Sequence, residues 1–167
     1  MRSRVGIGYD AHRFDSDREL VLGGVRIADG PGLAGHSDAD VLTHAVMDAL
    51  LGAAGLPDIG ELFPDTDAAY AGADSLQLLR QVVAAVIAAG WRIENVDAVV
   101  VCEAPRLAPH KAAIRAALAD AASLDASRVG VKATTTEGMG FEGRREGIGA
   151  TAVCLLAASD EGLPPSA

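Results

Sequence analysis

One stretch near the N-terminus, VGIGYDAHRF over residues 5–14, decides which fold this chain can adopt. Its G-x-G-x-x-A spacing also occurs in dinucleotide-binding loops, where the third small residue opens a helix whose N-terminus holds pyrophosphate. Here no amphipathic helix follows, because the next apolar residues, in LVLGGVRI at 20–27, have the spacing of strands. A dinucleotide-binding fold is therefore disfavoured, and residues 5–9 are expected to form a short strand that ends near Asp10.

Size and composition set the broad class of the protein. The 167 residues suit one domain, and because only 4% of them are aromatic, its core must consist of Ala, Val, Leu and Ile. The net charge of −9 disfavours non-specific binding to nucleic acid or to an anionic membrane. Cys102 and Cys154 form no C-x-x-C pair and no targeting segment is visible, so we expect a reduced, cytoplasmic protein.

Strand and helix signals alternate along the chain. Strands are expected at residues 5–9, at 20–27 as a hairpin turning at Gly23 and Gly24, and at 95–105, 128–133 and 148–158. Helices are expected from Ser37 or Asp38 to Ala54, from Asp74 or Ser75 to Ala89, and to Ala122 with Pro109 in the first turn. The pattern predicts an α/β (α+β) fold, with a single domain over residues 1–158 and a disordered C-terminal tail at 159–167.

Two side chains that can bind a metal, those of Asp10 and His12, stand at the end of the first predicted strand. In extended backbone Asp10 and His12 project to the same side, although a turn aspartate and a surface histidine have the same pattern. The first long helix places His44 where a polar stripe meets an apolar one, which suits either a third ligand or an ordinary boundary histidine. Two imidazoles and one carboxylate, with one position left open, are a common catalytic zinc arrangement.

Two further residues are expected near this zinc site. Asp48 lies one helical turn beyond His44, where its carboxylate is placed to accept a proton from a ligating histidine. His36, just before the helix, is expected at the mouth of the same site.

A second polar segment, KATTTEGMGFEGR over residues 132–144, follows a predicted strand. Its consecutive threonines and backbone N–H groups suit a phosphate, and Glu137 offers the hard oxygen ligand that Mg²⁺ uses beside phosphates. Lys132 and Arg144 supply positive charge within an acidic protein. The alternative is a solvated, threonine-rich loop.

Three motifs together resemble those of the 2-C-methyl-D-erythritol 2,4-cyclodiphosphate synthases. They are GYDAHRF, GHSDADVLTHAVMDALLGAAGLPDIGELFPDTD and KATTTEGMGFEGRREGI, and the similarity extends from about residue 4 to 157. The D-x-H, G-H-S-D-x-D-x-x-x-H and T-T-T-E elements are specific to this family in this order.

The resemblance implies a mixed sheet covered by helices on one side. It also implies a homotrimer in which the sheets pack around a three-fold axis and the active sites lie between subunits. The expected reaction, in the non-mevalonate isoprenoid pathway, converts 4-diphosphocytidyl-2-C-methyl-D-erythritol 2-phosphate to the 2,4-cyclodiphosphate with release of CMP. The expected cofactors are one Zn²⁺ per subunit, and Mg²⁺ or Mn²⁺ with the substrate diphosphate.

The resemblance also assigns roles to individual residues. The catalytic set is Asp10, His12, His44, Thr135 and Glu137, of which the first three bind zinc and Glu137 binds Mg²⁺ with the substrate phosphates. Substrate contacts fall on His36, Ser37, Asp58, Gly60, Asp65, Cys102, Pro105, Arg106, Leu107, Lys132, Ala133, Thr134, Thr135, Phe141 and Arg144. Phe141 and Arg144 are expected to line a cavity on the trimer axis that accepts isoprenoid diphosphates in some members. Family members often have lysine at position 106, and arginine keeps the charge but not the point-donor geometry, so a direct phosphate contact is expected at Thr135 rather than at Arg106.

Two other functions fit the same residues. A zinc hydrolase of phosphorylated small molecules would release inorganic phosphate or open-chain products rather than CMP. A non-catalytic trimer with structural zinc would usually fill all four metal positions from protein, and the sequence offers three convincing ligands.

Overall fold

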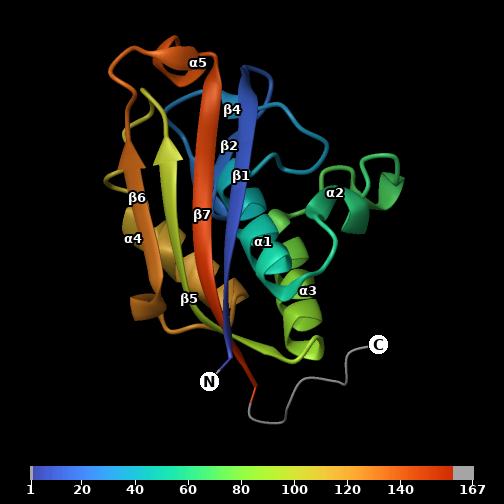
Figure 1. The fold of residues 1–167 in the computed structure, drawn as a ribbon. Helices are drawn as coiled ribbons and strands as arrows, with labels where there is room; N and C mark the ends of the chain where they lie inside the picture. Colours follow the sequence, from blue (N-terminus) through green and yellow to red (C-terminus); the bar gives the residue numbers. More distant parts are fainter. Residues whose placement is uncertain (1, 160–167) are drawn as a thin grey trace.

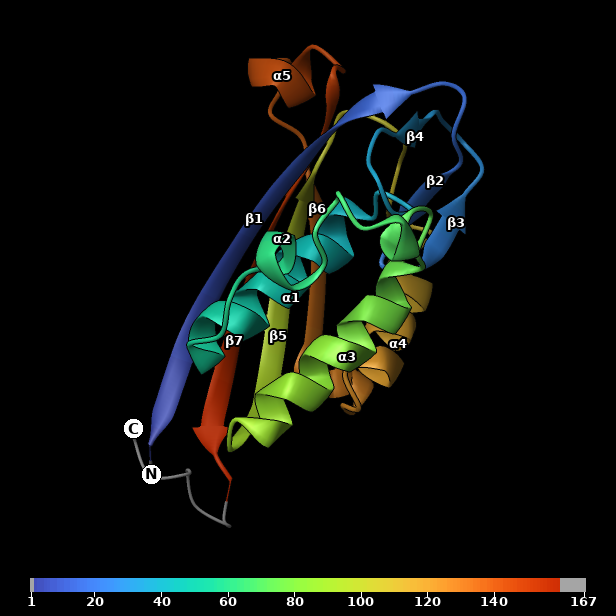
Figure 2. The ribbon, with the colours of Figure 1, turned by 90° about the vertical axis from the view of Figure 1, so that its right-hand side faces the viewer.

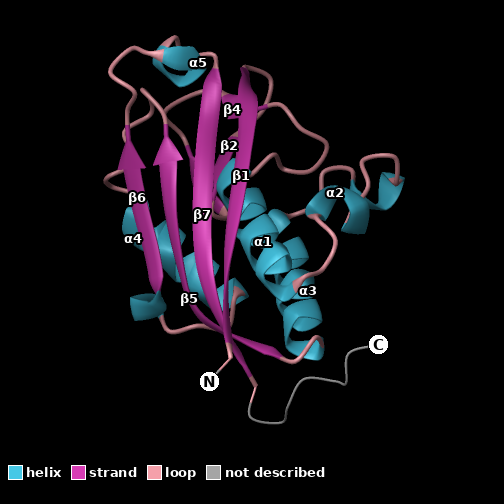
Figure 3. Ribbon diagram, viewed as in Figure 1, coloured by secondary structure: helices cyan, strands magenta, loops and turns pink. Residues whose placement is uncertain are grey.

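A mixed five-stranded sheet forms the centre of the protein (Figure 3). The computed structural model describes residues 2–159. The strand order is β4 (Gly32–Leu33), β1 (Ser3–Asp15), β7 (Gly147–Ala158), β5 (Trp91–Val101) and β6 (Val129–Thr134). Only β5 and β6 run parallel, and the other neighbours are antiparallel. The predicted mixed sheet is therefore confirmed.

The three long helices all lie on the same face of this sheet (Figures 1 and 2). They are α1 (Val41–Ala54), α3 (Ser75–Ala88) and α4 (Lys111–Ala121); the short helical segments are α2 (Ile59–Leu62), η1 (Ala68–Tyr70), η2 (Ala126–Arg128) and α5 (Gly140–Gly143). The one-sided helical layer expected from the resemblance is confirmed. Along residues 2–159, no helix is both long enough and apolar enough to cross a membrane.

The glycines of the opening motif allow helix α1 to approach strand β1 closely. A Cβ atom on Gly6 would lie 1.9 Å from the carbonyl oxygen of Ala49, and one on Gly8 would lie 2.0 Å from that of Ala45. The backbone of α1 therefore packs directly on the backbone of β1 at these two glycines. Because both glycines lie inside a strand, they do not form a dinucleotide-binding loop.

Within residues 2–159, no long helix packs on the other face of the sheet (Figure 2). Val5, Ile7 and Tyr9 alternate with the two glycines along β1, and their exposed fractions are 69%, 70% and 59%. Ile7 pairs with Val153 of β7, which is also exposed. We call these four residues the bare face; monomeric proteins rarely expose a contiguous apolar patch of this kind without a partner.

A small hairpin is fixed to the start of α1. Strands β2 (Leu20–Leu22) and β3 (Val25–Ile27) turn at Gly23 and Gly24, which both have positive φ, as a tight hairpin turn requires. Both of these N–H groups donate to the carboxylate of Asp40, at 2.9 and 2.7 Å. The predicted hairpin is confirmed, and it encloses the fully buried Asp40.

Several boundaries differ from the predictions. Strand β1 continues to Asp15 because it pairs with β7 along its length. Helix α1 begins at Val41, not near residue 37, because Asp40 is its cap and accepts from the N–H of Thr43. Helix α4 begins at Lys111, two residues beyond Pro109. Helix α3 begins at Ser75 after the cap Asp74, as predicted. The tail predicted for 159–167 lies, apart from Ser159, outside the described residues.

Candidate active site

Three side chains with metal-binding atoms converge where β1 packs on α1. Nε2 of His12 lies 2.8 Å from Oδ2 of Asp10 and 3.2 Å from Nδ1 of His44. The same Asp10 oxygen lies 3.0 Å from Nδ1 of His44. The structure therefore brings together the three residues predicted as ligands, and they form a group that could hold a metal ion.

The second nitrogen of each histidine has its own partner. Nδ1 of His12 lies 2.6 Å from the carbonyl oxygen of Ala34, which can only accept, so Nδ1 carries a proton and Nε2 is the ring nitrogen that faces the cluster and is available to a metal. Nε2 of His44 lies 3.1 Å from the hydroxyl oxygens of both Ser37 and Ser75. Such outer partners orient metal-binding histidines in known sites.

The spacing of the three atoms fits a small tetrahedral cation. Bonds of about 2.05 Å to zinc place tetrahedral ligand atoms about 3.3 Å apart. The three measured separations lie between 2.8 and 3.2 Å, so only small movements are needed. The donor set, one carboxylate and two imidazoles, leaves one position for another ligand.

Proximity within the cluster changes its acid–base behaviour. Burial by itself would raise the pKa of Asp10, but hydrogen bonds from His12 and His44 outweigh burial and hold the pKa well below its usual range. Burial would lower the pKa of His12, but its contact with the Asp10 carboxylate raises the pKa overall. In the absence of a cation the cluster therefore retains a proton that metal binding must displace.

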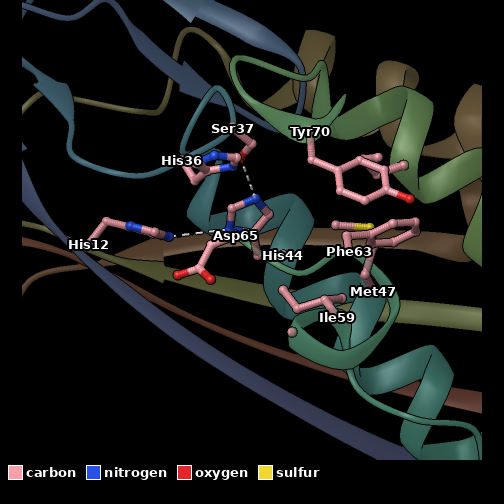
Figure 4. Close-up of a pocket in the computed structure, with 11 residues that line it drawn as sticks. His12, His36, Ser37, His44, Met47, Ile59, Phe63, Asp65 and Tyr70 are labelled. Carbon is pink, nitrogen blue, oxygen red and sulfur yellow. Dashed lines mark hydrogen bonds between the residues drawn. The ribbon is translucent and has the colours of Figure 1, made fainter. Parts of the chain in front are cut away.

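Two residues of the cluster, His12 and His44, line a cavity of about 360 Å³ (Figure 4). Its lining residues are His12, His36, Ser37, His44, Met47, Ile59, Gly60, Phe63, Asp65, Tyr70 and Leu78. Four predicted substrate residues, His36, Ser37, Gly60 and Asp65, therefore share one cavity with two of the candidate metal ligands, His12 and His44. Asp58 does not line it; its carboxylate caps α2 by accepting from the N–H of Glu61 at 3.0 Å.

A separate cavity of about 190 Å³ lies at the carboxyl ends of β5 and β6. It is lined by Cys102, Glu103, Pro105, Arg106, Leu107, Ala108, Lys111, Ala133, Thr134 and Thr135. The two predicted segments meet here because β5 and β6 are parallel neighbours, with Val101 opposite Thr134. Parallel strands end at one edge of a sheet, where α/β proteins commonly bind ligands.

Glu103 organises this edge, and the sequence reasoning missed it. Its Oε1 atom accepts from the N–H of Thr136 at 3.0 Å and from that of Gly138 at 3.2 Å. An acidic residue directly after a buried strand, in VCEAP, was the available signal. Glu103 ties the threonine-rich loop to the end of β5.

Other predicted residues lie outside both cavities. Lys132 forms an ion pair with Asp97, and Arg144 forms one with Glu146 at 2.6 Å. Glu137 is exposed in the loop before α5, with a φ of +53°. Phe141 lines a third, open cavity of about 640 Å³ with Ala11, His12, Arg13, Phe14 and Glu146.

One predicted supporting contact is wrong. Asp48 was expected to accept a proton from a ligating histidine, but its Oδ1 accepts from the N–H of Ile59 at 3.0 Å. The ring of His44 directs its second nitrogen toward Ser37 and Ser75 instead. Asp48 therefore holds the start of α2 in place.

Comparison with known proteins agrees with this geometry. The model of the YgbB family matches residues 3–157. The 2-C-methyl-D-erythritol 2,4-cyclodiphosphate synthase of Nostoc sp. is 58% identical over 161 residues, covering 96% of this chain and 98% of that protein. The bifunctional IspDF of Campylobacter jejuni has a TM-score of 0.92 and 44% identity, over 95% of this chain and 43% of that longer one. The IspF CDP complex of Plasmodium falciparum has a TM-score of 0.82 and 32% identity, over 95% and 97%. The chain therefore belongs to the YgbB family, together with the 2-C-methyl-D-erythritol 2,4-cyclodiphosphate synthases.

Proposed function

We propose that this protein converts 4-diphosphocytidyl-2-C-methyl-D-erythritol 2-phosphate to 2-C-methyl-D-erythritol 2,4-cyclodiphosphate with release of CMP, in the non-mevalonate pathway. The observation that carries the proposal is the Asp10–His12–His44 cluster, whose two histidines line a cavity together with His36 and Ser37. Family membership supplies the substrate, and the cluster supplies a place where its phosphates are held.

In the proposed reaction one phosphorus–oxygen bond forms at the β-phosphorus and another breaks. An oxygen of the 2-phosphate attacks the β-phosphorus, the bond from that phosphorus to the bridging oxygen breaks, and CMP leaves with the bridging oxygen. No protein nucleophile is required, because the attacking group belongs to the substrate. The protein must bring two anions together, so positioning and neutralisation of charge provide most of the catalysis.

The two metals have different proposed holders. Asp10, His12 and His44 hold Zn²⁺, which supplies Lewis-acid chemistry and a template for a phosphate oxygen. Glu137 holds Mg²⁺ or Mn²⁺ together with the diphosphate, because one carboxylate is a poor site for such a cation without substrate oxygens. Exposure of Glu137 at a loop leaves its carboxylate accessible to a bound substrate.

The remaining residues divide between the ends of the substrate. His36, Ser37, Asp58, Gly60 and Asp65 serve the methylerythritol end, in or beside the first cavity. The cytosine lies in the second cavity, against Cys102, Pro105, Arg106, Leu107 and Ala133, and Thr134 and Thr135 contact the phosphates. Lys132 contributes charge at this edge only by leaving its pairing with Asp97.

A homotrimer with sites between subunits is the proposed assembly. Asp10 and His12 of the metal cluster lie on β1 and the second cavity lies at the ends of β5 and β6, and β6 is three strand spacings from β1, or about 14 Å. A single substrate reaches both kinds of site when they come from neighbouring subunits. The bare face offers the apolar surface for that packing. In this assembly Phe141 and Arg144 line an axial cavity suited to an isoprenoid diphosphate.

A phosphorus NMR experiment tests the function. Purified protein with Zn²⁺ and Mg²⁺ is incubated with the cytidylyl substrate, and the expected products are CMP and the cyclic diphosphate. Release of inorganic phosphate or open-chain products would favour a hydrolase, and no turnover with zinc firmly bound would favour a structural trimer. His44→Ala is the matched variant: it should lose zinc and cyclisation while its circular dichroism spectrum is retained.

The trimer and the cellular location have their own support and tests. Light scattering at working concentration should give a trimer, and a monomer would contradict the assembly. A cytoplasmic location is in keeping with two buried, free cysteines. The net charge of −9 supports a protein that binds neither nucleic acid nor an anionic membrane.

A further inference from the structure

A fully buried serine lies behind the metal-binding cluster. The side chain of Ser75 has no solvent exposure. Its hydroxyl oxygen lies 2.5 Å from Oδ1 of Asp38 and 3.1 Å from Nε2 of His44. Asp38, Ser75 and His44 thus form a continuous chain of hydrogen bonds that ends at a candidate metal ligand.

The direction of each hydrogen bond in this chain follows from the chemistry of its members. An ionised carboxylate only accepts, so the single hydroxyl proton of Ser75 points to Asp38. Toward His44 the Ser75 oxygen can then only accept, so Nε2 of His44 must carry a proton. A neutral imidazole has one N–H, so when the ring is neutral, as zinc binding requires, that N–H is on Nε2 and Nδ1 presents its lone pair. Nδ1 is the atom that faces Asp10 and His12.

We propose that Ser75 and Asp38 are positioning residues that hold His44 in the tautomer and orientation required for metal binding. The inference rests on the proposed function, since it assigns a purpose to residues behind the proposed zinc site. Neither residue lines either cavity described above, so both act through His44 and not on the substrate.

The surrounding backbone makes this arrangement rigid. Gly72 N–H donates to His36 O at 2.8 Å, and Asp38 N–H donates to Ala73 O at 3.0 Å, which joins the two loops. Ser75 is the first residue of α3, and its N–H donates to Oδ2 of Asp38 at 2.9 Å. Asp38 thus receives two hydrogen bonds from one residue, and its carboxylate is fixed relative to α3.

The second hydroxyl near His44, that of Ser37, cannot fix the tautomer of His44 by itself. Ser37 Oγ accepts from the N–H of Ala39 at 3.2 Å, and no carboxylate within residues 2–159 directs its own proton. It can therefore either accept from Nε2 of His44 or donate to it. With Ser75 removed, both tautomers of His44 become accessible, and only one of them presents a lone pair to the metal.

The test compares zinc affinity and tautomer in three proteins: wild type, Ser75→Ala and Asp74→Ala. Asp74 caps the same helix by accepting from the N–H of Leu76 at 2.9 Å, but it has no hydrogen bond to His44, so it controls for loss of helix stability. Zinc dissociation constants are measured by competition with a chelating dye. Long-range ¹H–¹⁵N NMR of the metal-free proteins at mildly alkaline pH reports the tautomer of His44.

We expect Ser75→Ala to weaken zinc binding about 10–100-fold, as loss of outer partners does in known zinc sites, and to mix the His44 tautomers. Asp74→Ala should bind zinc like wild type even if it melts earlier. Unchanged affinity in Ser75→Ala would overturn the inference, and so would equal weakening in both variants. If Ser75→Ala does not fold, the wild-type spectrum still decides, because an Nε2 atom of His44 that carries no proton contradicts the proposal. Failure of wild type to bind zinc would instead count against the proposed function.

Discussion

The close contact between β1 and α1 allows a strong prediction for Gly8→Ala. The added Cβ would lie 2.0 Å from the carbonyl oxygen of Ala45 and 2.7 Å from the nitrogen of Ala49. Ordinary contact begins at 3.4 Å, so helix and strand must separate by roughly 1.4 Å. Both neighbours are backbone atoms of one helix, so no side-chain rotation relieves the clash.

The expected cost is at the upper end of that for overpacked cores, about 3 kcal/mol. For a chain of this size that corresponds to a fall of about 6–12 °C in melting temperature. The site should suffer as well, since Asp10 lies two residues along the strand and His44 directly precedes Ala45. A shift of 1.4 Å far exceeds the roughly 0.2 Å tolerance of metal–ligand distances, so zinc affinity should fall together with stability.

Gly52→Ala on the same helix is the matched control, because a Cβ there meets nothing within 4 Å. It should stabilise the protein by about 0.4–1 kcal/mol through the unfolded chain. Unfolding is followed by circular dichroism at one fixed protomer concentration, since assembly makes stability depend on concentration. A Gly8→Ala protein as stable as wild type, with normal zinc content, would refute the packing argument.

Three further outcomes are expected. Glu137→Gln should keep its zinc but lose most turnover and much of the Mg²⁺ dependence of CMP release, whereas an unchanged Mg²⁺ titration would make Glu137 an ordinary loop residue. Zinc uptake by the metal-free protein should release a proton at pH 6.5, because the pKa of His12 is raised and zinc binds the neutral ring. This proton release should fade as the pH rises above the pKa of His12. Calorimetry in two buffers of different ionisation enthalpy measures the proton release, and binding heats that do not depend on the buffer would contradict it. Burial raises the pKa values of Cys102 and Cys154 to about 11, so both thiols should react slowly with iodoacetamide at pH 8 until the protein is unfolded; rapid alkylation of the folded protein would show that they are accessible.

Local patterns in the sequence determined the elements of this fold. Alternating apolar residues, the glycine pair of the hairpin and the cap at Asp74 act over a few residues, so the hairpin, α3 and the existence of the long strands are predictable from neighbours in the chain. The bounds of β5, expected at 95–105 and found at Trp91–Val101, and the short strand β4 depend on pairing with other strands. The two-residue spacing of Asp10 and His12 is equally local, because it depends only on extended backbone. The substrate roles of the other site residues remain predictions.

Tertiary structure decided how those elements support one another. The sequence predicted Ser37 or Asp38 at the start of α1, but Asp40 is its cap, and the carboxylate of Asp40 is held by a hairpin that lies seventeen residues earlier. Ser75 meets His44 across thirty-one residues, and Lys132 meets Asp97 across thirty-five. A hydrogen bond between residues far apart in the chain produces no repeating pattern in the sequence, because its partners become neighbours only after the helices and strands have packed. The sequence thus determined the residues available for the metal cluster, and the packing of α1 on the glycines of β1 decided that they meet.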